Sequence, residues 1–202
     1  MSESIPSISA TGGLDRIYDA VQTVVPGVTE PVMQQAVWDT IEEFCIQSTF
    51  FRVWSAWTMG AGSNEFDFNP IDANTVAFEI ISVSGLSFWA AAPPAVLIDR
   101  GQPSGGKREG WAWLACKPVS LGCCSSLPSA LVDRWYEGLK NGTLMRLFAQ
   151  PAKPWSAMPL AQSCGTSYRA RIREARDLTQ RLYGGGAQPF SFPYFAQGRR
   201  KN

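Results

Sequence analysis

The sequence of 202 residues contains no histidine. Because histidine is the side chain that most often serves as a general base near neutral pH, its absence removes the familiar nucleophile–base pairs. It also leaves cysteine as the main candidate for a zinc ligand. The five cysteines are odd in number and irregularly spaced, and they do not form two Cys-x-x-Cys pairs: Cys45, Cys116, Cys123, Cys124 and Cys164. We therefore expect reduced thiols, with no metal site and no cofactor.

Charge and long apolar runs are also scarce. Charged residues make up 17% of the chain and the formal net charge is +1. A nearly neutral chain has no overall attraction to nucleic acid, and a charge-poor surface is typical of subunits that bury area against one another. With no run of about 18 apolar residues and no basic, apolar leader, we expect neither a membrane span nor a secretory signal.

Common catalytic motifs are missing as well. The segment 101–107 has the glycine and lysine spacing of a phosphate-binding loop, but Arg108 replaces the Ser or Thr that would bind the metal ion. This favours a hairpin loop. A hydrolase would need a pair of carboxylates, and four acids are candidates: Asp67, Asp72, Glu79 and Asp99. Scattered acids near strand ends are usually solvated. We expect that the protein is not an enzyme.

Helical patterns begin the chain. One covers residues 14–25 and ends at Pro26-Gly27, and a second follows Thr29, a suitable N-cap, to about Ser48. The second helix has one apolar stripe, made of Met33, Val37, Ile41, Phe44 and Ser48. Its opposite side carries Asp39, Glu42 and Glu43. These spacings predict a core-facing helix with an acidic outer face.

Residues 51–125 have a β character. Runs of β-branched and aromatic residues, separated by Gly, Pro, Asn and Asp, predict strands at 51–54, 75–83, 95–98 and 111–115. Five tryptophans fall in this region: Trp54, Trp57, Trp89, Trp111 and Trp113. They serve either the core of the region itself or contact with a partner. Since helices flank this region, it is expected to be an antiparallel insertion that projects from a helical body.

Helical patterns return after Pro128. The first is expected to stop at Asn141-Gly142, a suitable left-handed C-cap, and a brief helix continues to about Ala149. A last helix is predicted from an N-cap at Ser156 to Tyr183. Its apolar stripe would be Leu160, Cys164, Tyr168, Ile172, Ala175, Thr179 and Leu182. Arg169, Arg173, Arg176 and Gln180 lie away from that stripe and form a basic face.

The final residues, 184–202, follow a triple glycine and have no hydrophobic period. We expect an extended arm that docks on another chain, although a free terminus is the alternative. The residues expected to dock are Pro189, Phe190, Phe192, Pro193, Tyr194, Phe195, Arg199 and Arg200.

Several motifs occur in a characteristic order. The helix 31–48 contains A-x-x-x-x-x-x-E-F-C from Ala36 to Cys45. After the β region, W-x-x-G-x-x-x-G-x-L-x-x-L-x-x-Q-P-x-K-P-W-S runs from Trp135 to Ser156. R-x-x-I-x-x-A-R follows from Arg169 to Arg176, and P-x-F-A from Pro193 to Ala196. Together these motifs resemble the head-to-tail adaptor proteins of tailed bacteriophages, of the short-tailed type. The triple glycine and the aromatic tail depart from that pattern.

The resemblance implies an α+β fold: a mainly helical bundle with an inserted antiparallel β region and an extended C-terminal arm. Residues 1–50 and 126–183 would form the helical body, 51–125 the insertion and 184–202 the arm. It also implies a structural virion protein in the phage neck, assembled in the host cytoplasm as a ring, commonly of about twelve copies. The ring would join the portal protein to the tail tube or nozzle and let genomic DNA pass without sequence-specific binding.

Two sets of contacts follow from this picture. Asp39, Glu42 and Glu43 are expected to meet Arg169, Arg173 and Arg176 across neighbouring subunits. The loop tips expected to face the tail carry Asn69, Pro70, Gln102 and Lys107.

A second function remains open at this point. The aromatics of the β region and the basic helix would also suit a single-stranded nucleic-acid-binding module. Against it, the basic residues and the exposed-type aromatics lie on different segments of the chain.

Overall fold

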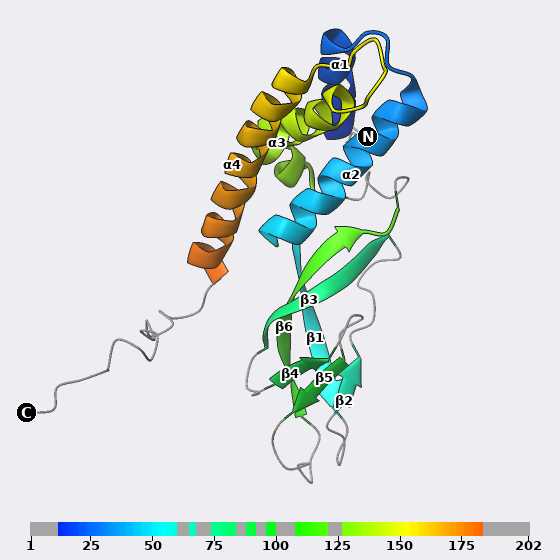
Figure 1. The fold of residues 1–202 in the computed structure, drawn as a ribbon. Helices are drawn as coiled ribbons and strands as arrows, with labels where there is room; N and C mark the ends of the chain where they lie inside the picture. The colour runs from blue at the N-terminus through cyan, green and yellow to red at the C-terminus, as the bar shows by residue number, and fades with distance from the viewer. Residues whose placement is uncertain are drawn as a thin grey trace, which may run out of the picture.

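Helices gather at one end of the molecule and strands at the other (Figure 1). The computed structural model describes residues 12–59, 65–67, 74–83, 88–91, 96–99, 108–120 and 127–183. The helices are α1 (Gly12–Val24), α2 (Glu30–Ser48), α3 (Ser129–Phe148) and α4 (Met158–Tyr183). All the strands come between α2 and α3, so the α+β class and the position of the β region are confirmed. Among the described residues, no helix is both long enough and apolar enough to cross a membrane.

The β region contains two antiparallel sheets. One has the order β1-β6-β3, with β1 (Arg52–Met59), β6 (Arg108–Pro118) and β3 (Thr75–Val83). The other has the order β2-β5-β4, with β2 (Glu65–Asp67), β5 (Val96–Asp99) and β4 (Phe88–Ala91). The four predicted strand regions correspond to β1, β3, β5 and β6. The short strands β2 and β4 were not predicted.

The core joins the two ends of the molecule. Every residue of the stripe predicted for α2 is buried, from Met33 to Ser48. Leu114 and Cys116 on β6 are fully buried and belong to the same apolar core as α2 and α3. Phe44 packs against Trp135 of α3, with ring centroids 5.7 Å apart. The sheet is therefore anchored to the helices by its longest strand.

The break predicted at Asn141-Gly142 is wrong, because α3 runs through it to Phe148. A Cβ atom on Gly142 would lie 2.5 Å from Cγ2 of Thr40 on α2 and 2.8 Å from the ring of Tyr168 on α4. Such a distance is shorter than real side-chain contacts allow. Glycine is therefore required here for the close approach of three helices, and it does not end one.

The apolar stripe predicted for α4 is confirmed in the middle of the helix and wrong at its ends. Tyr168, Ile172, Ala175 and Thr179 are buried, whereas Leu160 and Leu182 are exposed. In the first turn the buried residue is Ala161, one position later than expected, and Thr179 is the last buried position. The helix also begins at Met158 instead of directly after Ser156, whose backbone N–H donates to the carbonyl of Lys153.

Candidate interaction surfaces

The acidic face of α2 is engaged within the chain. Glu42 forms an ion pair with Lys117 of β6, at 2.5 Å between Oε1 and Nζ, and Glu43 forms one with Arg146 of α3. Asp39 accepts a hydrogen bond from the side-chain amide of Gln35 at 2.7 Å. Because two of the three carboxylates already hold a cation, this face offers a neighbouring molecule little net negative charge.

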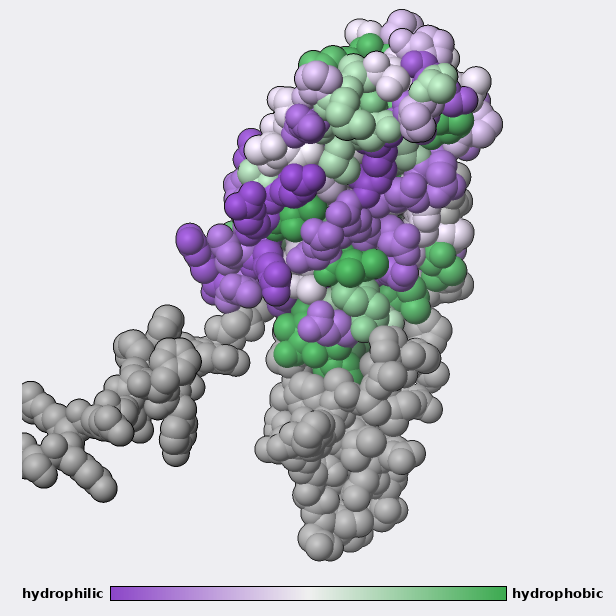
Figure 2. All heavy atoms as spheres, viewed as in Figure 1, coloured by the Kyte–Doolittle hydropathy of each residue, from purple (hydrophilic) through white to green (hydrophobic). Residues whose placement is uncertain are grey.

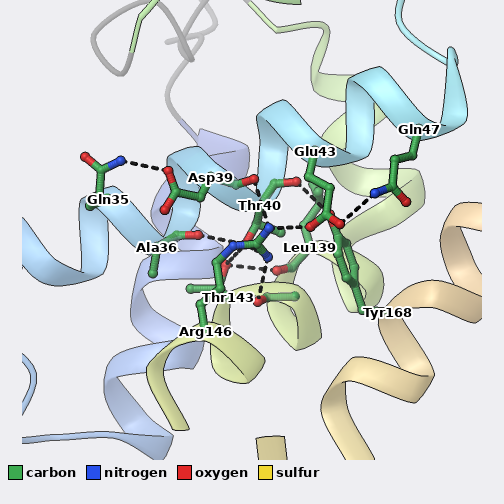
Figure 3. Close-up of polar contacts among 11 residues, drawn as sticks. Gln35, Ala36, Asp39, Thr40, Glu43, Gln47, Leu139, Thr143, Arg146 and Tyr168 are labelled. Carbon is green, nitrogen blue, oxygen red and sulfur yellow. Dashed lines mark hydrogen bonds and ion pairs between the residues drawn. The ribbon is translucent and has the colours of Figure 1, made fainter. Parts of the chain in front are cut away.

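Arg146 is the centre of a polar cluster between three helices (Figure 3). Its Nη1 donates to Oγ1 of Thr40 and to the carbonyl of Gly142, both at 3.1 Å. Its Nη2 donates to the carbonyl of Asp39 at 3.1 Å and to the carboxylate of Glu43. From α4, the hydroxyl of Tyr168 donates to the carbonyl of Thr40 at 2.8 Å. Burial and the nearby Glu43 carboxylate raise the pKa of Tyr168, so it remains a donor.

The sequence did not identify this cluster. A usable signal was present, since Thr40 and Thr143 are fully buried hydroxyl residues on otherwise apolar helix faces. Buried hydroxyls require partners, and Arg146 lies one turn after Gly142 and Thr143 on the same helix.

The basic face of α4 lines a groove at the junction of the helices and the sheet. The groove encloses about 960 Å³ and is lined on the α4 side by Arg169, Arg173, Arg176 and Gln180. The other wall comes from the end of α2 and from the first and third strands, including Arg52 and Glu79. Figure 2 shows hydrophilic side chains gathered over this part of the helical end, next to hydrophobic ones at the start of the β region. The groove thus combines four arginines with one glutamate.

The position of Arg52 is fixed by the turn that joins α2 to β1. Thr49 ends α2 in the left-handed conformation, with φ of 49°, and its N–H donates to the carbonyl of Cys45. Arg52 Nε then donates to the carbonyl of Thr49 at 2.8 Å. The guanidinium is held at the helix end, where a cation also interacts favourably with the helix dipole.

The acidic and basic faces are neighbours on one chain. A hollow of about 490 Å³ lined by Asp39, Glu42 and Glu43 shares Ile46 and Gln47 with the arginine-lined groove. The pairing of the two faces across adjacent subunits stays a prediction.

Two tryptophans of the β region are surface residues. Trp54 and Trp111 stack on each other, with ring centroids 3.9 Å apart and ring planes at 15°. Their side chains are 47% and 48% exposed, and Trp113, the residue opposite Trp54 on β6, is half-buried. At least this pair does not serve the core, which favours contact with a partner.

Other predicted site residues lie outside the described part of the chain. They are the arm residues Pro189, Phe190, Phe192, Pro193, Tyr194, Phe195, Arg199 and Arg200, and the loop residues Asn69, Pro70, Gln102 and Lys107. The side chains of Trp57 and Trp89 are likewise outside it. Within the described residues, no group of three or more Cys, Asp or Glu is placed to hold a metal ion.

The link between α3 and α4 contributes to packing. Trp155 Nε1 donates to Oε1 of Gln150 at 3.3 Å, and its ring lies 3.8 Å from the Cβ position of Gly27, in the turn between α1 and α2. Gly138 lies one turn before Gly142 on α3. A Cβ atom added to Gly138 would lie 3.0 Å from the Cβ of Arg171, so the glycine lets α4 approach α3 closely.

No protein-family model matches the sequence, and no curated protein is significantly similar to it.

Proposed function

We propose that this protein is a structural, ring-forming adaptor of the phage neck, which joins the portal to the tail. The observation that carries the proposal is the order of elements. Two helices, a β region, a third helix, a proline-containing link and a long fourth helix follow one another as the resemblance to head-to-tail adaptors implies.

The residues of the shared motif support this proposal by their positions. Gly138 and Gly142 stand where α3 meets its neighbours, and Trp155 and Gln150 tie the link to the helical body. Each match to the motif is weak by itself. The matches together are better support for the proposal because the matched residues are also those at which the helices pack, so the sequence pattern and the fold are consistent.

In this proposal, the two ends of the subunit meet different partners. Residues 184–202 follow α4 and would dock on the portal as an arm. The loops that contain Asn69-Pro70 and residues 102–107 would face the tail tube or nozzle. Genomic DNA would pass through the centre of the ring.

Deletion of residues 188–202 tests the portal contact. We expect the truncated protein to fold, since the described residues from Leu14 to Ala175 already form a continuous buried apolar cluster. We also expect it to lose binding to purified portal rings in a co-sedimentation assay. The matched control lengthens the 102–107 loop with Gly and Ser in the full-length chain. That variant should keep portal binding and fail to attach tails to heads that lack the protein. Portal binding at full strength without the arm would contradict the proposed docking, and loss of portal binding in the loop variant would show that the two ends are reversed.

A further inference from the structure

The arginine groove and the tryptophan pair belong to one continuous surface. Directly opposed residues of antiparallel strands point to the same side of a sheet. In one row across the sheet, Ala115 of β6 is opposite Arg52 of β1 and Glu79 of β3. In the next row on the same side, Trp54 of β1 is opposite Trp113 of β6. Trp111 is opposite Ala56 in the row after that. Arg52 therefore lies in the groove and only about 7 Å along the strand from the stacked tryptophans.

Basic and aromatic residues that lie on separate segments of the chain are brought together by folding, through β1. The net charge of the chain is only +1, so attraction to nucleic acid would come from this local concentration of arginines. Arg169, Arg173 and Arg176 of α4 line the wall opposite Arg52. From Arg169 to Gln180 the helix extends about 16 Å along the groove.

The surface carries more positive than negative charge, so an anionic ligand would bind to it favourably. The acids on it, among the described residues, are Glu79 in the groove and Glu109, two positions before Trp111 on the same side of β6. Four arginines outweigh them. Arg169 and Arg173 are also an i, i+4 pair of like charge, an arrangement that disfavours the isolated helix. The acidic face of α2 is a poor complement for this groove, because Glu42 and Glu43 are ion-paired with Lys117 and Arg146.

The exposed tryptophan pair is suited to bind flat, apolar groups by stacking. Two indole rings that are half exposed and stacked on a sheet present a platform on which an unpaired base can stack. A base inside a duplex cannot reach such a platform without leaving its stack. A phosphate backbone with accessible bases satisfies both parts of the surface.

We propose that this surface binds single-stranded nucleic acid, with phosphates in the groove beside Arg169, Arg173 and Arg176 and bases on Trp54 and Trp111. The site is separate from the arm and loop contacts of the proposed ring. Its α4 arginines are also the ones expected to meet a neighbouring subunit, so nucleic acid and a second copy are alternative occupants that the experiment below distinguishes.

Binding of a fluorescent 20-nucleotide oligothymidine to the full-length protein tests the proposal, followed by anisotropy over a range of salt concentrations. Arg173→Gln with Arg176→Gln removes two groove charges, and the slope of log affinity against log salt should become shallower by about 1.4. The matched control, Arg171→Gln with Arg181→Gln, removes two charges from α4 outside the groove and should leave the slope unchanged. Trp54→Ala should weaken binding roughly tenfold, and Trp54→Phe should restore most of the loss. A duplex of equal length should bind more weakly.

Three results would overturn the proposal. Equal slopes for the groove and control variants would mean that the groove holds no phosphate. Equal affinity for duplex and single strand, with no effect of Trp54→Ala, would mean that no base stacks on the pair. Unchanged oligonucleotide binding together with a loss of subunit assembly in Arg173→Gln with Arg176→Gln, measured by native mass spectrometry, would assign these arginines to a neighbouring copy.

Discussion

Gly142 decides how closely three helices pack. In an open helix interior, replacing glycine by alanine stabilises by about 1 kcal/mol through helix propensity. Here the added methyl group would meet Thr40 and Tyr168 at 2.5 and 2.8 Å, and overpacking of this kind costs about 1–3 kcal/mol. Since the two effects oppose each other, we expect Gly142→Ala to lower the free energy of unfolding by about 1 kcal/mol, and by no more than about 2 kcal/mol, in urea denaturation.

Gly27→Ala is the control for that prediction. The nearest atom to its Cβ position is in the ring of Trp155 at 3.8 Å, an ordinary contact. Its free energy of unfolding should stay within about 0.5 kcal/mol of the wild-type value. A more stable Gly142→Ala protein would mean that the glycine faces open space inside the helix, because alanine would then add helix propensity without a clash.

Cys116 predicts a loss of stability at alkaline pH. Burial raises the pKa of this thiol from 9.0 to about 11. Between these values the unfolded chain has lost the proton and the folded chain has kept it, so the free energy of unfolding falls as pH rises. The full effect is about 2–3 kcal/mol.

The measurement compares wild type with Cys116→Ala by urea denaturation at pH 8, 9.5 and 10.5. Alanine does not ionise, so the stability advantage of the wild type should shrink over this range. A constant difference between the two proteins would contradict the burial of an ionisable thiol at this position.

At the residue scale, the sequence predicted burial well where the helical period was strict. Met33, Val37, Ile41 and Phe44 repeat at helical spacing, and all are buried. It failed at Gly142, because a glycine needed for a close approach and a glycine that ends a helix look the same in one chain. The difference depends on Thr40 and Tyr168, which are distant in sequence.

At the scale of elements, Arg146 joins α2, α3 and α4 through one side chain. Its side chain is only 20% exposed and its guanidinium donates to Thr40, Asp39, Gly142 and Glu43. Truncation would leave partly buried acceptors and the Glu43 carboxylate without their donor. We expect Arg146→Met to lower the free energy of unfolding by about 2 kcal/mol.

Arg171→Met is the matched control, since Arg171 also forms an ion pair, with Glu174, but its side chain is 49% exposed. Surface pairs of this type contribute about 0.5 kcal/mol or less. Differential scanning calorimetry of both variants distinguishes the two roles. Equal midpoints for the two variants would mean that the Arg146 cluster adds no stability beyond that of a solvated pair.

The elements themselves were predictable where the pattern was long. The range of β3 was predicted residue for residue, because five of its nine residues from Thr75 to Val83 are β-branched and no Gly or Pro interrupts them. The buried positions at the ends of α4 were not predicted correctly. The burial of Ala161 and the exposure of Leu182 depend on how far α2 and α3 pack along α4, and the local sequence period does not determine this.

At the scale of the whole molecule, the sequence predicted the order of helices and strands but not the surface that they form. The β region lies between α2 and α3 as expected. The meeting of Arg52 and Trp54 with the α4 arginines depends on the register of β1 on β6 and on the angle of α4. Likewise, the pairing of Glu42 with Lys117 joins residues 75 positions apart. Such contacts depend on the topology of the fold, and no sequence motif predicts them.

Native mass spectrometry of the full-length protein, alone and with purified portal rings, tests the central claim of a ring-forming adaptor most directly. We expect a closed oligomer of uniform size, near twelve copies, at least when the portal is present. Negative-stain images of the same sample should show an annulus with an open centre. A protein that remains monomeric at micromolar concentration, and that leaves the mass of the portal ring unchanged, would not be a ring-forming adaptor.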